Sequence, residues 1–199
     1  MRRSKGRSWR GAVLAGWACL TLAASAQERF DERVDTLLAI RGLSDRYGHI
    51  QEAIIQPFHP KTDTKMRERS SPEEDDVVGW VALARLVLGP AVGVQAPPNL
   101  ANLSGERLLD RLLRAGADDF GGVSPMTIDF INPEAPWPQI HTLERVSAEM
   151  GLRLRQRLAL YPEYIVHKQG FIDTTLEARL RAMVDAEGFP VAQAEAISP

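Results

Sequence analysis

The chain has 199 residues, of which 44% are hydrophobic and 25% are charged, and its formal net charge is -2. This length and composition are enough for one soluble domain with a sizeable core. The basic residues are spread along amphipathic segments and form no stripe, which argues against a nucleic-acid-binding protein. The single cysteine, Cys19, excludes an internal disulfide and any cysteine-ligated cluster built from this chain alone.

Residues 1–27 differ from the rest and are assigned to a signal-like or aberrant N-terminal segment. Residues 1–10 are cationic, residues 11–24 are apolar but too short to span a bilayer comfortably, and residues 24–26 read ASA, a small-x-small pattern. This order is typical of a secretory signal peptide. Periodicity does not separate that interpretation from a buried strand with an N-terminal extension, so both stay open.

From Gln27 onward, helical and strand patterns alternate. Helices are predicted over 28–48, 71–90, 104–117, 137–151 and 174–188, and strands over 50–58, 91–95 and 152–160. The first helix is expected to bury a face made of Phe30, Val34, Leu37, Leu38 and Leu43. The second begins with a capping pattern of Ser71, Pro72 and Glu74 and ends at Gly89, and the third turns four leucines inward, Leu108, Leu109, Leu112 and Leu113.

This alternation predicts an α/β fold with a mainly parallel sheet and right-handed crossovers. An eight-unit barrel needs about 250 residues, so residues 28–190 are predicted to form roughly half of one, followed by a tail at 191–199. In such sheets, ligand sites form at the carboxyl ends of the strands.

Polar residues after the predicted strands are therefore candidates for binding a substrate or cofactor. The candidates are Gln56, Asn99, Asp119, Ser124, Asp129 and Asn132. Asp129 and Asn132 have an alternative role as turn-forming residues, and Gly121 and Gly122 are expected to allow a backbone conformation that a side chain would forbid. The histidines His59, His141 and His167 are not spaced as metal ligands, and catalytic residues are left unassigned.

Four stretches carry a resemblance to a known family: RVDTLLAIRGLSDRYGHIQEAIIQPFHPK, QAPPNL, GADDFGGVSPMTIDFINPEAPWP and LALYPEY. They resemble the C-terminal half of the radical S-adenosylmethionine subunit of FO synthase, the 7,8-didemethyl-8-hydroxy-5-deazariboflavin synthase, from about Glu32 to about Gly188. The resemblance implies a partial radical S-adenosylmethionine barrel and a lyase reaction that forms a deazaflavin ring. It further implies a 4Fe-4S cluster, S-adenosylmethionine, a tyrosine–ribitylaminouracil adduct as substrate and a companion subunit, with no nucleic-acid or membrane partner.

The chain departs from the family pattern in its cysteines. The family holds its cluster with a CxxxCxxC loop, because three thiolates bind three irons and leave the fourth for S-adenosylmethionine. No such loop occurs in these 199 residues, and Phe120 stands where the family more often has tryptophan. We expect a truncated or frame-shifted product that is cytoplasmic and inactive alone. The alternatives are a non-catalytic half-barrel that needs a partner and a secreted α/β protein of unknown role.

Overall fold

The computed structural model describes residues 18–22, 30–99 and 105–191. Three strands within these ranges form one sheet: β1 (Ala18–Leu22), β2 (Glu52–Pro57) and β3 (Gly93–Gln95). The strand order is β1-β2-β3, and both neighbouring pairs are parallel. The prediction of an α/β fold with a parallel sheet is thereby confirmed, and closure into a barrel stays a prediction.

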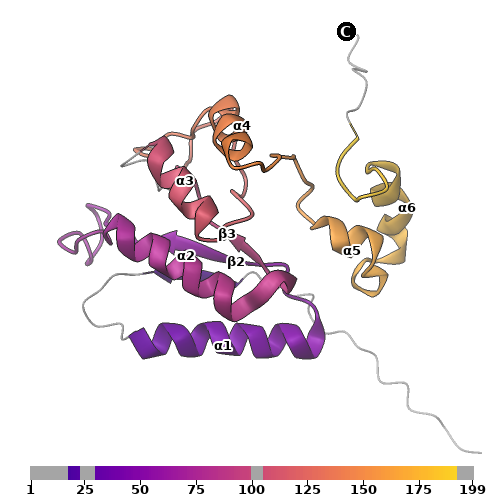
Figure 1. Ribbon diagram of the computed structural model, residues 1–199, viewed down its shortest axis with the longest axis horizontal. Helices are drawn as coiled ribbons and strands as arrows, with labels where there is room; N and C mark the ends of the chain where they lie inside the picture. The colour runs from indigo at the N-terminus through magenta and orange to yellow at the C-terminus, as the bar shows by residue number, and fades with distance from the viewer. Residues whose placement is uncertain (1–17, 23–29, 100–104, 192–199) are drawn as a thin grey trace, which may run out of the picture.

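Helices follow each strand (Figure 1). α1 (Phe30–Tyr47) and α2 (Glu74–Leu88) lie side by side against the sheet, and α2 runs into the short 3-10 helix η1 (Gly89–Ala91). α3 (Glu106–Arg114) packs on α4 (Ile140–Glu149). The C-terminal part holds α5 (Pro162–Val166), the 3-10 helix η2 (Gln169–Phe171) and α6 (Thr174–Ala182).

The main core lies between the sheet and the helices α1, α2 and α3. Ala53 and Ile55 of β2 and Val94 of β3 are almost fully buried on this face. Because side chains alternate along a strand, the neighbouring residues Glu52 and Gln56 of β2 belong to the opposite face. That opposite face of the sheet would line the interior of a barrel, and it carries the polar groups described below.

The inward face predicted for α3 is confirmed for three of its four leucines, with Leu113 partly buried, and the predicted face of α1 is wrong in part. Leu108, Leu109 and Leu112 are buried as expected. In α1, however, Leu37 is buried together with Ile40 and Arg33, while three residues of the predicted face are exposed, namely Phe30, Leu38 and Leu43. The guanidinium of Arg33 lies 4.7 Å from the centroid of the Trp80 ring. This cation–π contact joins α1 to α2 and accounts for an arginine on the buried face of α1.

The predicted cap of α2 is also wrong. The helix begins at Glu74 with Glu73 at the N-cap position, and no side chain caps it. Carboxylates occupy the first turn instead, where they interact favourably with the helix dipole, and Arg111 of α3 pairs with Glu74 and Asp75. The predicted end is confirmed, because Gly89 follows the last helical residue with a φ of 66°.

The strand predicted over 152–160 is wrong. Residues 152–158 have no regular secondary structure and no strand partner among the described residues, and α5 follows at Pro162. Two arginines hold this segment through their side chains: Arg155 pairs with Asp185 and Glu187, and Arg157 pairs with Glu52 and Asp119. Alternation of leucine with arginine therefore marks a side-chain-anchored segment here, which we call the 152–161 strap.

Parts of the N- and C-terminal segments lie outside the described residues, namely 1–17, 23–29 and 192–199, as does Ser104 at the start of the predicted third helix. Within the segment 1–27, residues 18–22 form β1, which pairs with β2. A strand in this apolar run was one of the two interpretations of the sequence, and the other was a signal peptide. Among the described helices, none combines the length and apolar character needed to cross a membrane.

Candidate functional site

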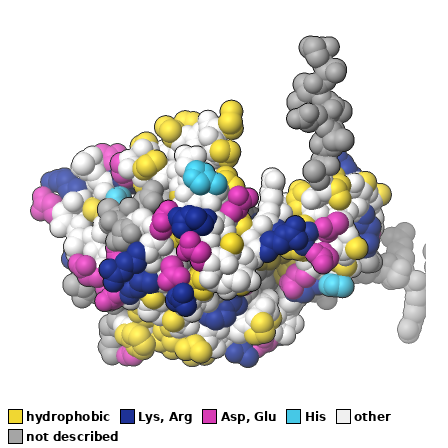
Figure 2. Space-filling view, turned by 45° about the horizontal axis from the view of Figure 1, so that its top comes forward, with side chains coloured by type: hydrophobic (Ala, Val, Ile, Leu, Met, Phe, Trp, Pro, Cys, Tyr) yellow, Lys and Arg dark blue, Asp and Glu magenta, His cyan; other side chains and the backbone are white. Residues whose placement is uncertain are grey.

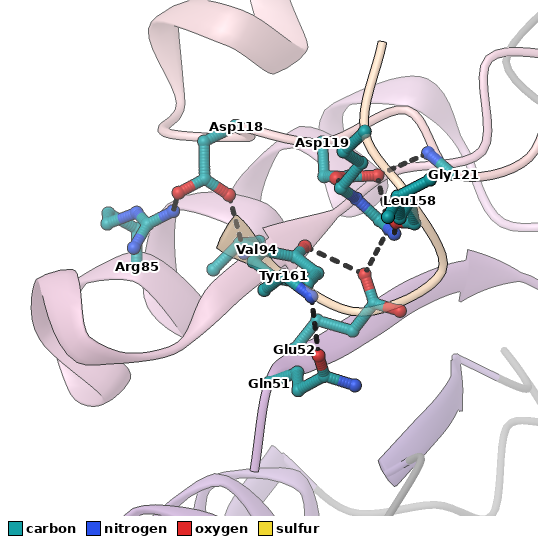
Figure 3. Close-up of polar contacts among 10 residues, drawn as sticks. Gln51, Glu52, Arg85, Val94, Asp118, Asp119, Gly121, Leu158 and Tyr161 are labelled. Carbon is teal, nitrogen blue, oxygen red and sulfur yellow. Dashed lines mark hydrogen bonds and ion pairs between the residues drawn. The ribbon is translucent and has the colours of Figure 1, made fainter. Parts of the chain in front are cut away.

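A buried ion cluster forms where the 152–161 strap meets the sheet (Figure 3). Arg157 Nη2 lies 3.2 Å from Glu52 Oε2 and donates to Asp119 Oδ1 at 3.1 Å. The Tyr161 hydroxyl donates to the same Glu52 oxygen at 2.8 Å, and the Arg157 guanidinium lies 4.3 Å from the Tyr161 ring centroid. One guanidinium thus neutralises two carboxylates whose side chains are only 5% and 11% exposed.

Burial controls the ionisation of this cluster. It raises the pKa of Glu52, and the nearby charge of Asp119 adds to that rise, while the Tyr161 hydrogen bond and Arg157 oppose it. Burial also raises the pKa of the Tyr161 hydroxyl, which the carboxylates of Asp119 and Glu52 reinforce. Tyr161 therefore stays a neutral hydrogen-bond donor.

The buried ion cluster extends along the sheet, with Glu52 at the amino ends of the strands and Asp119 beside Gln95, the last residue of β3. Glu52 is the first residue of β2, and it pairs in register with Gly93, the first residue of β3. A Cβ on Gly93 would lie 2.6 Å from the Tyr161 hydroxyl oxygen, so the ring packs directly on the β3 backbone. Because parallel α/β folds bind ligands at the carboxyl ends of their strands, Glu52 lies at the end of the sheet away from the expected ligand site.

Asp119, a predicted site residue, belongs to this cluster. Besides Arg157, its carboxylate accepts a hydrogen bond from the Gly121 backbone N–H at 2.5 Å, and its backbone oxygen accepts from Ala96 N at 3.0 Å. The preceding residue, Asp118, pairs with Arg85 and accepts from Val94 N at 2.7 Å (Figure 3). Asp119 thus joins the sheet to the loop that begins at Gly121.

Three other predicted residues meet at the carboxyl-end side of the strands. Asn99 Nδ2 donates to Asp129 Oδ2 at 2.8 Å and to the backbone oxygen of Ala135 at 3.3 Å. Asn132 Nδ2 donates to the same Asp129 oxygen at 3.1 Å. Asn99 and Asn132 are both buried, with 1% and 5% of their surface exposed. We call this group the Asn99 site.

Asp129 organises the Asn99 site. Partial burial raises its pKa, but hydrogen bonds from the Asn132 side chain, the backbone N–H groups of Ile131 and Asn132, and the Asn99 side chain outweigh burial and hold the pKa below its usual value. All four donors reach one carboxylate. Asp129 is therefore an anion at neutral pH whose oxygens are engaged inside the protein.

One polar atom of the Asn99 site lacks a hydrogen-bond partner among the described residues. This atom is the buried side-chain oxygen Oδ1 of Asn99. Buried polar atoms are nearly always hydrogen-bonded, so an orphaned acceptor points to a missing donor. The arrangement can accept a hydrogen bond from a ligand hydroxyl or N–H group.

The remaining two predicted residues are Gln56 and Ser124. Gln56 is half-buried near the end of β2. Ser124 Oγ accepts hydrogen bonds from Thr127 N at 3.1 Å and Thr127 Oγ1 at 2.8 Å, so it organises its own turn. Sequence reasoning missed Glu52, Arg157 and Tyr161, although an acidic residue opening an apolar strand was a usable signal for the first.

The donor set of this chain does not fit a 4Fe-4S cluster. Such a cluster needs three thiolates from a CxxxCxxC loop, and the sequence has only Cys19, which lies in β1. Within the described ranges, no three His, Cys, Asp or Glu side chains are grouped so that they could hold a metal ion.

Anaerobic treatment of the purified chain with iron and sulfide is accordingly expected to give no cluster. The absorbance of a 4Fe-4S centre should be absent, and S-adenosylmethionine should not be cleaved under reducing conditions, because one thiolate cannot replace three. Cluster absorbance or cleavage by the isolated chain would contradict this prediction.

Comparison with known proteins shows what the chain is similar to. It is 46% identical over 158 residues to the FO synthase of Streptomyces avermitilis, an alignment that covers 79% of this chain and 18% of that protein. It is 44% identical over 162 residues to the 7,8-didemethyl-8-hydroxy-5-deazariboflavin synthase of Methanopyrus kandleri, covering 81% of this chain and 46% of that protein. No family model and no solved structure matches the chain.

The synthase of Methanoculleus marisnigri gives the same relation, with 42% identity over 163 residues and 46% of its length covered. The chain therefore spans less than half the length of these curated relatives. The resemblance inferred from the sequence motifs is confirmed: over about four fifths of its residues, this chain is a homologue of one part of the FO synthases.

Proposed function

We propose that this chain supplies the substrate-binding side of an FO synthase reaction and acts together with a polypeptide that provides the rest of the enzyme. The names of the relatives and their greater length support this proposal. The substrate is a small molecule rich in hydroxyl and N–H groups, the tyrosine–ribitylaminouracil adduct that the resemblance implies. Because S-adenosylmethionine is a cytosolic metabolite, the proposed place of action is the cytoplasm.

The open oxygen of Asn99 carries the proposal. Asp129 and Ala135 take both hydrogen bonds of the Asn99 amide nitrogen, which fixes the side chain and leaves Oδ1 as a buried acceptor. A ligand hydroxyl or ring N–H would satisfy this acceptor. Asp129 is then a positioning residue that holds Asn99, and burial excludes water from the contact.

The radical chemistry is assigned to the other polypeptide. When bound, a 4Fe-4S cluster with S-adenosylmethionine supplies the radical that such a reaction needs. This chain lacks the three thiolates. Its own residues would bind and orient the substrate.

Binding of a ribitylaminouracil to the purified chain, measured by isothermal titration calorimetry, tests the proposal. Asn99→Ala is expected to weaken binding about tenfold, since a net hydrogen bond is worth about 1 kcal/mol and a stranded polar group costs somewhat more. Asp129→Ala should weaken it similarly, because Asn99 loses its anchor.

Asp110→Ala serves as the matched control. Asp110 lies in α3, where it pairs with Arg114 on the surface, and its loss should leave binding unchanged. Failure of the unaltered chain to bind the probe would contradict the proposed function, as would equal affinities of the Asn99→Ala variant and the unaltered chain at equal folded fractions.

A further inference from the structure

Residues 126–131 form an exposed apolar loop beside the Asn99 site. Four of its six side chains are large and hydrophobic, and their exposed fractions are 88% for Met126, 58% for Ile128, 81% for Phe130 and 77% for Ile131. Single exposed hydrophobic residues are ordinary, but four in six consecutive positions form a patch. Hydrophobic side chains also reach the surface between charged ones on the face shown in Figure 2.

Hydrogen bonds within the loop keep its hydrophobic side chains exposed. Asp129 accepts from Ile131 N at 2.9 Å and from Asn132 N at 3.1 Å, which closes a tight turn around Phe130. The same carboxylate binds the buried Asn99 and Asn132. Since the polar residue of the turn points inward, its apolar neighbours Phe130 and Ile131 are left facing outward.

The free edge of the sheet and the length of a relative indicate what could cover the loop. β1 has a strand neighbour on one side only, β2, among the described strands. The match covers 46% of the Methanopyrus protein, so more than half of that relative lies outside the match. If further strands continue the sheet beyond β1 and curve round, their carboxyl ends reach the face that carries the Asn99 site and the exposed apolar loop.

We infer that the exposed apolar loop is the docking surface for a polypeptide corresponding to the part of the FO synthases that this chain does not match. The inference rests on the proposed function and adds the place where the two pieces meet. The partner would present an apolar surface, because the loop offers four hydrophobic side chains and keeps its carboxylate engaged within the turn. A ligand held by Asn99 would then lie next to the junction of the two polypeptides.

Co-expression tests the inference. The full chain would be produced together with the part of the Methanopyrus kandleri synthase that lies outside the match, and the complex would be purified through a tag on this chain. The double variant Phe130→Ser, Ile131→Ser is expected to retain at least tenfold less of the second polypeptide. Leu86→Ser is the matched control, because Leu86 is 79% exposed on α2 and lies outside the loop.

Each outcome decides the inference. Equal retention by the loop variant and the unaltered chain would overturn it, and so would absence of a complex with the unaltered chain. Self-association of the unaltered chain that the loop variant abolishes would overturn it in favour of a second copy as partner. The melting temperatures of all variants should agree, since the changed side chains are exposed. A complex that forms without binding a ribitylaminouracil would refute the proposed function and leave the docking surface standing.

Discussion

Replacing Arg157 with methionine is expected to lower the free energy of unfolding by about 3 kcal/mol at pH 7. Arg157 is the cation that contacts both Glu52 and Asp119 in the buried ion cluster. Its loss leaves two nearly buried carboxylates facing each other, whereas methionine keeps most of the apolar volume. Breaking a buried pair typically costs roughly 3–5 kcal/mol, and the residual 17% exposure of Arg157 favours the lower end.

The penalty should depend on pH. Burial already raises the pKa of Glu52 above its ordinary 4.5, and removing the opposing charge of Arg157 raises it further. A carboxyl whose pKa is higher in the folded state stabilises the fold when protonated, and this contribution is lost as pH rises through the folded-state pKa. The difference between the two proteins should therefore shrink as pH falls from 7 toward 4.5.

Urea unfolding of the Arg157→Met variant and the unaltered protein across this pH range provides the measurement. Arg145→Met is the control, because Arg145 pairs with Glu106 and Glu149 on the surface. Exposed pairs contribute about 0–1 kcal/mol, so this variant should stay close to the unaltered protein. A penalty at Arg157 no larger than that at Arg145 would show that the cluster contributes no special stability.

The sequence predicted the parallel strands and the leucine face of α3 because these depend on local patterns. It wrongly predicted a strand over residues 152–160. Alternating leucine and arginine fits a half-buried strand, yet a strand needs a hydrogen-bonding neighbour that the segment itself does not specify. Arg157 instead pairs with Glu52, which lies 105 positions away. Pairing at that separation is invisible in a single sequence.

The candidate site was also predicted correctly in part. The rule that parallel sheets bind ligands at strand ends selected Asn99, Asp129 and Asn132, and the structure brings these three into contact. The rule also selected Asp119, whose carboxylate points to Arg157 in the buried ion cluster. A residue's position after a strand is readable from the sequence, but the direction of its side chain depends on partners from other parts of the chain.

Gly121 and Gly122 were expected to allow a backbone conformation that a side chain would forbid. In the structure this holds for Gly121 and not for Gly122. Gly121 has a φ of 73°, in the left-handed region, whereas Gly122 has no positive φ and nothing within 4 Å of its Cβ position. A Cβ on Gly121 would also lie 2.7 Å from Cδ of Gln95. Only the first glycine is therefore required by the turn that leads from Asp119 into the loop.

Gly121→Ala is expected to destabilise the protein by about 2 kcal/mol, because the left-handed conformation costs an L-residue roughly 1–2 kcal/mol and Gln95 must also move. Gly122→Ala should stay within about 0.5 kcal/mol of the unaltered protein, since its backbone and surroundings accept a methyl group. Urea unfolding compares the two at equal protein concentration. Equal effects of the two substitutions would mean that the loop adjusts freely at Gly121. A loss confined to Gly121→Ala would show that the left-handed backbone at Gly121 fixes where the loop toward the Asn99 site begins.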